Sequence, residues 1–211
     1  MKLLRIDSSA RNSSVSRALT SNFVQAWKRE NPEGQAVERD LAKTTQPTMV
    51  TDEWTQAIHS DPAKLTAAQR ELLADSETLI AELVAADIIV IGAPMYNFTI
   101  SWPLKAWIDQ VVRIGKTFGY GPNGPKGLLT GKKAVVITSR AGSYAAGTER
   151  AKIDFQEPYL RHMLGFIGIT DVTFIHAENQ RPGGELAEPS RVAALEQIGE
   201  LVVKQSHAAS V

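Results

Sequence analysis

Hydrophobic and polar positions along the chain follow two alternating patterns, which predict alternating strands and helices. Short continuous apolar runs are typical of strands that are buried on both faces of a parallel sheet. The clearest run is Ile88-Ile89-Val90-Ile91, and it ends abruptly at Gly92-Ala93-Pro94. We predict four further strands, at residues 2–7, 35–41, 134–138 and 172–175.

Apolar residues at helical spacing lie between these strands. Leu19, Phe23 and Trp27, for example, share one face of a predicted helix. The pattern Thr66-Ala67-Ala68-Gln69 matches a capping box and predicts the start of a second, long helix. In total we predict five helices, at about residues 15–30, 66–84, 103–112, 155–165 and 188–202.

Two segments fit neither pattern. Residues 42–65 are polar and irregular, and a loop of this length is usually a lid, a partner contact or disordered. Trp54 argues against plain disorder there. Residues 116–131 carry five glycines and two prolines, too many for a helix or a central strand. We expect Phe118 and Tyr120 of this second segment to lie near the carboxyl edge of the sheet.

The alternation of strand and helix predicts an α/β fold. Five strand–helix repeats favour a five-stranded parallel sheet with helices on both faces. The most common short strand order is 2-1-3-4-5, the flavodoxin-like arrangement. A chain of 211 residues suits one such domain, so we predict a single domain over residues 1–211.

Composition excludes several classes of function. Lys+Arg and Asp+Glu both number 23, so nothing predicts electrostatic capture of nucleic acid or of an anionic membrane. The chain has no cysteine, which excludes thiol nucleophiles and cysteine-ligated metals, and its four histidines show no metal-ligand spacing. The first apolar run is too short for a signal peptide or a membrane span, so we expect a cytoplasmic protein.

A serine-rich turn follows the first predicted strand and leads into the first helix. It reads Ser8-Ser9-Ala10-Arg11-Asn12-Ser13-Ser14-Val15-Ser16. Free amides at a helix N-terminus bind anions, and serine hydroxyls add donors, so we favour a phosphate site. The alternative is that Ser14 or Ser16 only caps the helix. The turn contains no glycine, so neither a Walker loop nor a dinucleotide fingerprint is present.

A second distinctive turn, Met95-Tyr96-Asn97-Phe98, follows the central strand. It offers backbone amides, one carboxamide and two aromatic rings, which suit a flat heterocycle with polar edges. The alternative is a plain connection whose aromatic residues only pack. A third turn, Ser139-Arg140-Ala141-Gly142, follows the fourth strand. In the predicted order all three turns meet at one crevice, where open α/β sheets bind ligands, and together they describe a flavin mononucleotide (FMN) site.

The chain also resembles a known family, the FMN-dependent NADH azoreductases, which reduce quinones and azo compounds. The resemblance spans nearly the whole chain. Its most specific segments are Ala93-Pro94-Met95-Tyr96-Asn97-Phe98, Thr130-Gly131-Lys132-Lys133, Ile137-Thr138-Ser139-Arg140 and residues 164–171. Two positions depart from the family pattern. Ala141 stands where the family usually has glycine, and the serine turn is one residue shorter than in some relatives.

The resemblance implies a set of binding residues. It implies FMN phosphate contacts from Ser9 and from Ser14-Val15-Ser16, and ring contacts from Met95-Tyr96-Asn97-Phe98 and Ser139-Arg140-Ala141-Gly142. It also implies a homodimer with the site at the interface, where Tyr120 and Phe166, from the other subunit, line the substrate pocket. His59 is a further candidate for that pocket, although a histidine in a long loop is more often a solvated surface residue.

The implied reaction has NADH as donor and quinones or aromatic azo compounds as acceptors. Donor and acceptor would use one pocket in turn, which gives ping-pong kinetics, and no side chain is needed as a nucleophile. Two alternatives remain open at this point. One is a flavodoxin-like electron carrier or regulatory module, and the other is a binding domain without flavin. Steady NADH consumption with a small acceptor excludes the carrier, and a colourless protein indicates the binding domain.

Overall fold

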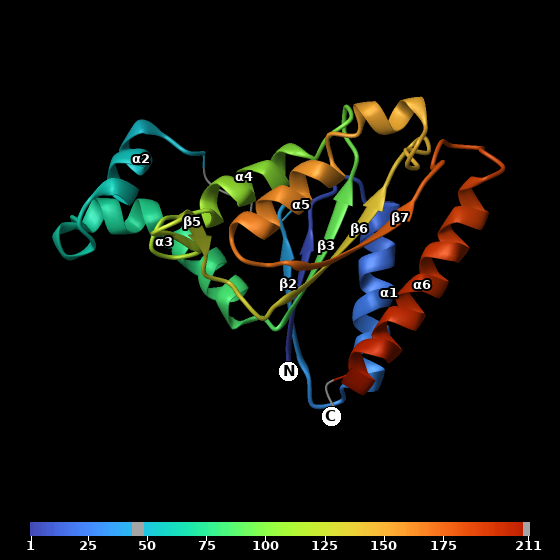
Figure 1. The fold of residues 1–211 in the computed structure, drawn as a ribbon, viewed down its shortest axis with the longest axis horizontal. Helices are drawn as coiled ribbons and strands as arrows, with labels where there is room; N and C mark the ends of the chain where they lie inside the picture. Colours follow the sequence, from blue (N-terminus) through green and yellow to red (C-terminus); the bar gives the residue numbers. More distant parts are fainter. Residues whose placement is uncertain (44–48, 209–211) are drawn as a thin grey trace.

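A computed structural model describes residues 1–43 and 49–208 of the chain, with side chains up to residue 205. Its main sheet has five parallel strands in the order β2-β1-β3-β6-β7 (Figure 1). The five strands are β1 (Lys2–Asp7), β2 (Gln35–Asp40), β3 (Ile88–Pro94), β6 (Lys133–Ser139) and β7 (Asp171–Ala177). The predicted five-stranded parallel sheet is therefore confirmed.

Helices cover both faces of this sheet (Figure 1). Two of them, α1 and α6, pack on one face, and α3, α4 and α5 pack on the other. The described α-helices are α1 (Val15–Glu30), α2 (Asp52–His59), α3 (Ala67–Ala85), α4 (Trp102–Val111), α5 (Glu157–Phe166) and α6 (Ala187–Ala208). None of the helices in the described ranges is long and apolar enough to cross a membrane.

The central strand β3 shows why the sheet needs both layers. Every residue of β3 is buried. Ile88 and Val90 belong to the core beneath α1 and α6, whereas Ile89 and Ile91 belong to the core beneath α3, α4 and α5. Successive side chains of a strand point to opposite faces, so a continuous apolar run is satisfied only when both faces are covered.

The predicted strand order 2-1-3-4-5 needs one correction, because the structure has two strands that the sequence pattern did not predict. They are β4 (Phe118–Gly121) and β5 (Gly124–Gly127), which form a separate antiparallel hairpin. One of the glycines that argued against a strand here makes the hairpin turn possible: Gly124, directly after the turn, has a φ angle of 102°. Counted in sequence, the fourth and fifth strands of the main sheet are thus β6 and β7.

The prediction that residues 42–65 are irregular is wrong for its second half. Thr51 caps α2, and a short 3-10 helix, η1 (Pro62–Lys64), follows. Trp54 and Ala57 on one face of α2 are buried against Leu73 of α3. This contact stabilises a short amphipathic helix that composition alone does not reveal. Residues 44–48 of the predicted loop lie outside the described residues.

Candidate functional site

The three turns singled out in the sequence meet at the carboxyl edge of the sheet. They follow β1, β3 and β6, which are neighbours in the sheet. A cavity of about 340 Å³ lies where they meet. From these turns it is lined by Ser9, Arg11, Ser13, Ser14, Val15, Pro94, Met95, Tyr96, Ser139 and Ala141. The predicted convergence of the three turns is therefore observed.

The serine turn presents buried hydroxyls beside the start of α1. Ser9, Ser14 and Ser16 are all buried. The hydroxyl of Ser14 accepts a hydrogen bond from the amide of Arg17 at 3.3 Å and lies 3.1 Å from the hydroxyl of Ser16. Ser14 thus caps α1, as the alternative interpretation held. The amides of Val15 and Ser16 stand in the first helical turn, where no intrahelical carbonyl can accept from them, so donors remain for an anion.

A network of charged groups on α1 and β2 holds the serine turn in place. Nη2 of Arg17 donates to the carbonyl oxygen of Ser9 at 2.6 Å, and the same guanidinium pairs with Asp40 at the end of β2. Burial alone would raise the pKa of Asp40, but the hydrogen bond and charge of Arg17 outweigh it and hold that pKa below its ordinary value. Asp40 therefore stays ionised and fixes Arg17, and Arg17 fixes the turn.

The second turn is a tight two-residue turn with an unusual backbone. The amides and carbonyls of Tyr96 and Thr99 exchange two hydrogen bonds, of 2.9 and 3.1 Å. Asn97 and Phe98 between them have φ angles of 47° and 70°. A residue with a side chain costs roughly 1–2 kcal/mol in this left-handed region, and such strain concentrates at functional sites. Phe98 is nevertheless 48% exposed as a residue, so packing does not explain the strain.

The third turn is fixed by the side chain of Arg140, which is only 2% exposed. Its Nε donates to Oε1 of Gln156 at 3.0 Å, and its guanidinium pairs with Asp154 at 3.1 Å. Its amide donates to the carbonyl of Ala177 at 2.9 Å. The guanidinium is thus held by these partners in the protein interior. Of this turn, Ser139 and Ala141 line the cavity.

The remaining wall of the 340 Å³ cavity comes from a segment that the sequence patterns did not single out. Gln180, Arg181, Pro182 and Gly183 follow β7, and Arg191 of α6 lies beside them. The amide of Gln180 donates to the carbonyl of Arg140 at 2.9 Å, which joins this segment to the third turn. The dipeptide Pro182-Gly183 after a predicted strand was a usable turn signal.

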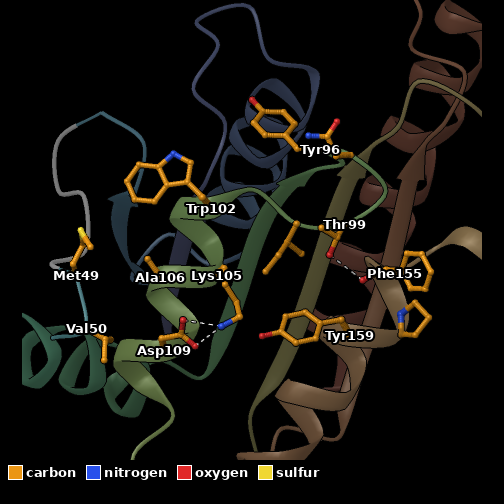
Figure 2. Close-up of a pocket in the computed structure, with 13 residues that line it drawn as sticks. Met49, Val50, Tyr96, Thr99, Trp102, Lys105, Ala106, Asp109, Phe155 and Tyr159 are labelled. Atoms are coloured by element: carbon orange, nitrogen blue, oxygen red, sulfur yellow. Dashed lines mark hydrogen bonds and ion pairs between the residues drawn. The ribbon is translucent and has the colours of Figure 1, made fainter. Parts of the chain in front are cut away.

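A second, larger cavity of about 960 Å³ adjoins the second turn (Figure 2). Tyr96 lines both cavities. Figure 2 shows Tyr96, Trp102 and Tyr159 projecting around this space from three different elements. On its α4 side, Nζ of Lys105 pairs with Asp109 at 2.6 Å, so both charges are neutralised. The result is a largely apolar space with an aromatic rim beside the turn of Asn97.

Three predicted pocket residues lie elsewhere within one copy of the chain. His59 ends α2, which packs on α3. Tyr120 and Phe166 belong to an aromatic group around Phe118, with ring centroids 6.0 and 4.8 Å from the Phe118 ring. The hairpin lies between the end of α4 and the start of β6, at the amino edge of the sheet. The prediction that Phe118 and Tyr120 hang near the carboxyl edge is therefore wrong for a single chain.

A family described as having a flavodoxin-like fold matches residues 1–202. The chain belongs to this flavodoxin-like family. The curated relatives include the FMN-dependent NADH:quinone oxidoreductase of Azotobacter vinelandii, which is 46% identical over 204 residues, 95% of this chain and 98% of the relative. The FMN-dependent NADH:quinone oxidoreductase 2 of Pseudomonas putida is 48% identical over 188 residues, 89% of this chain and 92% of that relative.

Solved structures agree with this flavodoxin-like assignment. An azoreductase from Bacillus anthracis superposes with a TM-score of 0.88 at 28% identity, and the match covers 97% of this chain and 99% of that one. The resemblance to the azoreductase family that the sequence motifs indicated is confirmed. In this flavodoxin-like chain, the cavity where the three turns meet is the candidate cofactor site.

Proposed function

We propose that this chain is an FMN-dependent NADH oxidoreductase that reduces quinones and aromatic azo compounds. The observation that carries the proposal is the cavity at which the three turns converge. The names of relatives that are 46–48% identical over nearly the whole chain support the same activity. Enzymes of one fold differ in function, so the argument rests on the site and on these near full-length relatives, not on the fold alone.

The residues of the cavity fit FMN. Buried serine hydroxyls and the amides of Val15 and Ser16 suit a phosphate, and none of the described residues that line the cavity is a carboxylate. We assign the phosphate to Ser9 and to Ser14-Val15-Ser16. We assign the ring to Met95-Tyr96-Asn97-Phe98 and to the backbone of Ser139-Arg140-Ala141-Gly142. When bound, FMN supplies the hydride chemistry between NADH and the acceptor.

The protein itself binds and orients the reactants. The strained backbone at Asn97 holds its amide in a fixed direction beside the large cavity, where it would donate to a polar ring edge. The aromatic rim of the large cavity, with Tyr96, Trp102 and Tyr159, suits flat acceptors such as quinones and azo compounds. Donor and acceptor occupy the same face in turn, which gives ping-pong kinetics. Full cleavage of an azo bond takes four electrons and therefore two molecules of NADH.

We further propose a homodimer that completes this pocket. Trp102 at the rim of the large cavity is 58% exposed, and Tyr120 on the hairpin is 71% exposed. Exposed aromatic residues of this size are typical of interfaces. In such a dimer, Tyr120 and Phe166 of the second copy line the acceptor pocket. His59 in that pocket, the single domain and the cytoplasmic location stay predictions.

Initial-rate kinetics test the proposed function. NADH oxidation is followed over a grid of NADH and quinone concentrations, and separately with an azo dye. Ping-pong turnover gives parallel double-reciprocal lines and consumes two NADH per azo bond cleaved. Absence of NADH oxidation with every acceptor, in protein that retains FMN, would contradict the enzyme assignment and favour an electron carrier.

A further inference from the structure

A third cavity, of about 780 Å³, borders the candidate FMN cavity. Ala141 and Arg181 line both, so the two spaces meet beside the third turn. The walls of this groove come from the residues after β6 and from those after β7. It is lined by Ala141, Gly142, Ser143, Thr148, Glu149, Arg150, Asn179, Arg181, Gly184, Glu185 and Leu186. Its volume lies within the range of small-molecule sites.

Two arginines, Arg150 and Arg181, line this groove, and neither guanidinium is tied to another described side chain. In the described part of the chain, no ion pair or side-chain hydrogen bond is found for Arg150 or Arg181. By contrast, Arg17 and Arg140, which hold the turns around the FMN cavity, are both paired with carboxylates. Paired guanidinium groups are the side chains best suited to a diphosphate, because their planar donors match its oxygens.

The guanidinium of Arg150 lies against Gly142 of the third turn, in space that a side chain there would fill. A Cβ atom built at Gly142 would lie 2.0 Å from Nη1 of Arg150, so any other residue would displace the guanidinium. Arg150 comes from the 3-10 helix η2 (Glu149–Ile153), whereas Arg181 comes from the segment after β7. Both cations line the groove that adjoins the third turn.

The outer part of the groove has different chemistry. Glu185 lines it, and Leu186 beside it is 61% exposed. A carboxylate accepts from the ribose 2′-hydroxyl of NAD and repels the 2′-phosphate of NADP. An exposed leucine offers an apolar surface for an adenine ring. Glu149 also lines the groove, but its carboxylate is paired with Lys152 at 2.8 Å.

We propose that this groove binds the adenosine diphosphate half of NADH. Arg150 and Arg181 bind the diphosphate, and Glu185 accepts from the adenosine ribose, which selects NADH over NADPH. The inference rests on the proposed function, because it requires the nicotinamide half to lie at the FMN site, next to Ala141 of the third turn. It goes further by assigning the adenosine diphosphate half a groove of its own, while the nicotinamide half and the acceptor still use the same face of the flavin in turn.

The test compares two donors in the FMN-loaded protein. NADH carries the adenosine diphosphate half, whereas 1-benzyl-1,4-dihydronicotinamide carries only the reactive ring. The variant Arg150→Ala, at a residue that lines this groove and not the FMN cavity, should raise the KM for NADH about 10-fold and leave the KM for the benzyl donor within about twofold. Arg70→Ala, an exposed arginine on α3, is the matched control and should change neither. An unchanged KM for NADH, or an equal loss with both donors, would overturn the proposal.

A binding measurement separates this inference from the proposed function. Calorimetric titration with ADP should show binding to the wild-type holoprotein and about tenfold weaker binding to Arg150→Ala. A protein that oxidises no NADH would refute the proposed function, yet arginine-dependent ADP binding would still support the groove. Absence of ADP binding to the wild type would overturn the groove even if NADH is oxidised.

Donor selectivity tests the role of Glu185. Glu185→Gln removes the carboxylate and should lower the ratio of the KM for NADPH to the KM for NADH about fivefold, the effect of one charge pair near the surface. Glu71→Gln on α3 serves as the control for a loss of surface charge. An unchanged ratio in Glu185→Gln would overturn the assignment of the ribose to this residue.

Discussion

The guanidinium of Arg17 holds the carbonyl oxygen of Ser9, with Nη2 and the oxygen 2.6 Å apart. One residue of α1 thereby fixes the far end of the turn that precedes the same helix. The carboxylate of Asp40 fixes the guanidinium in turn. The candidate phosphate site is therefore a closed unit of turn, helix and neighbouring strand, held together by contacts within the chain.

Loss of this contact should weaken FMN binding without unfolding the protein. In Arg17→Ala the serine turn loses its anchor, and we expect the Kd for FMN to rise about tenfold, the worth of one charge-assisted hydrogen bond. Fluorescence titration of FMN measures the Kd. Arg29→Ala, an exposed position on the same helix, is the control. Equal FMN affinity in Arg17→Ala and Arg29→Ala would show that the anchor is irrelevant to the site.

Substitutions at Ser14 separate its two candidate roles. Aspartate caps helices as well as serine does, so Ser14→Asp should keep the stability of the apoprotein. Its negative charge would repel a phosphate, so FMN binding should fall at least 100-fold. Ser14→Asn keeps the cap without the charge and is the matched control. If Ser14→Asp binds FMN as tightly as Ser14→Asn does, Ser14 is only a cap and the phosphate lies elsewhere.

The backbone strain at Phe98 makes a prediction about stability. Glycine adopts a φ of 70° without cost, so Phe98→Gly should be more stable than Phe98→Ala, by about 1 kcal/mol. Both variants lack the ring, so the comparison isolates the backbone. Urea denaturation of the apoproteins gives the difference. A Phe98→Gly variant that is less stable than Phe98→Ala would mean that the left-handed turn carries no strain.

The proposed dimer predicts a dependence of assembly on Trp102. Wild-type protein at micromolar concentration should sediment as a dimer. Trp102→Glu places a charge at an exposed aromatic site and should raise the dimer Kd at least 30-fold, which corresponds to about 2 kcal/mol for an interface hot spot. Trp102→Phe keeps an aromatic ring and should remain dimeric. Sedimentation velocity decides the matter, and a monomeric wild type would refute the dimer.

The sequence predicted the parts of this structure that depend on pattern and topology. The central strands of the sheet were predictable because residues such as Ile89 and Val90 form continuous apolar runs that need two covered faces. The edge strand β2 was predicted from a short alternating stretch instead. The meeting of the three turns followed from strand order, because carboxyl ends of neighbouring parallel strands share one edge. Neither inference required knowledge of any side-chain contact.

The sequence did not predict features that depend on tertiary contacts. Arg140 was predicted to contact the flavin ring as part of the third turn. Its side chain, however, pairs with Asp154 in the interior, which is a contact between residues of different elements. Helix α2 depends on the burial of Trp54 against Leu73, and the wall from Gln180 to Gly183 depends on the bond to Arg140. Local composition does not reveal such contacts, because each one joins segments that come together only in the folded chain.

The visible spectrum of the purified protein tests the central claim most directly. The protein is incubated with FMN, freed of excess, and then titrated with NADH without oxygen. We predict a retained yellow colour that NADH bleaches and that a quinone or an azo dye restores. Colour that is retained but not bleached by NADH would contradict the oxidoreductase assignment. A colourless protein after removal of excess FMN would contradict the cofactor site itself.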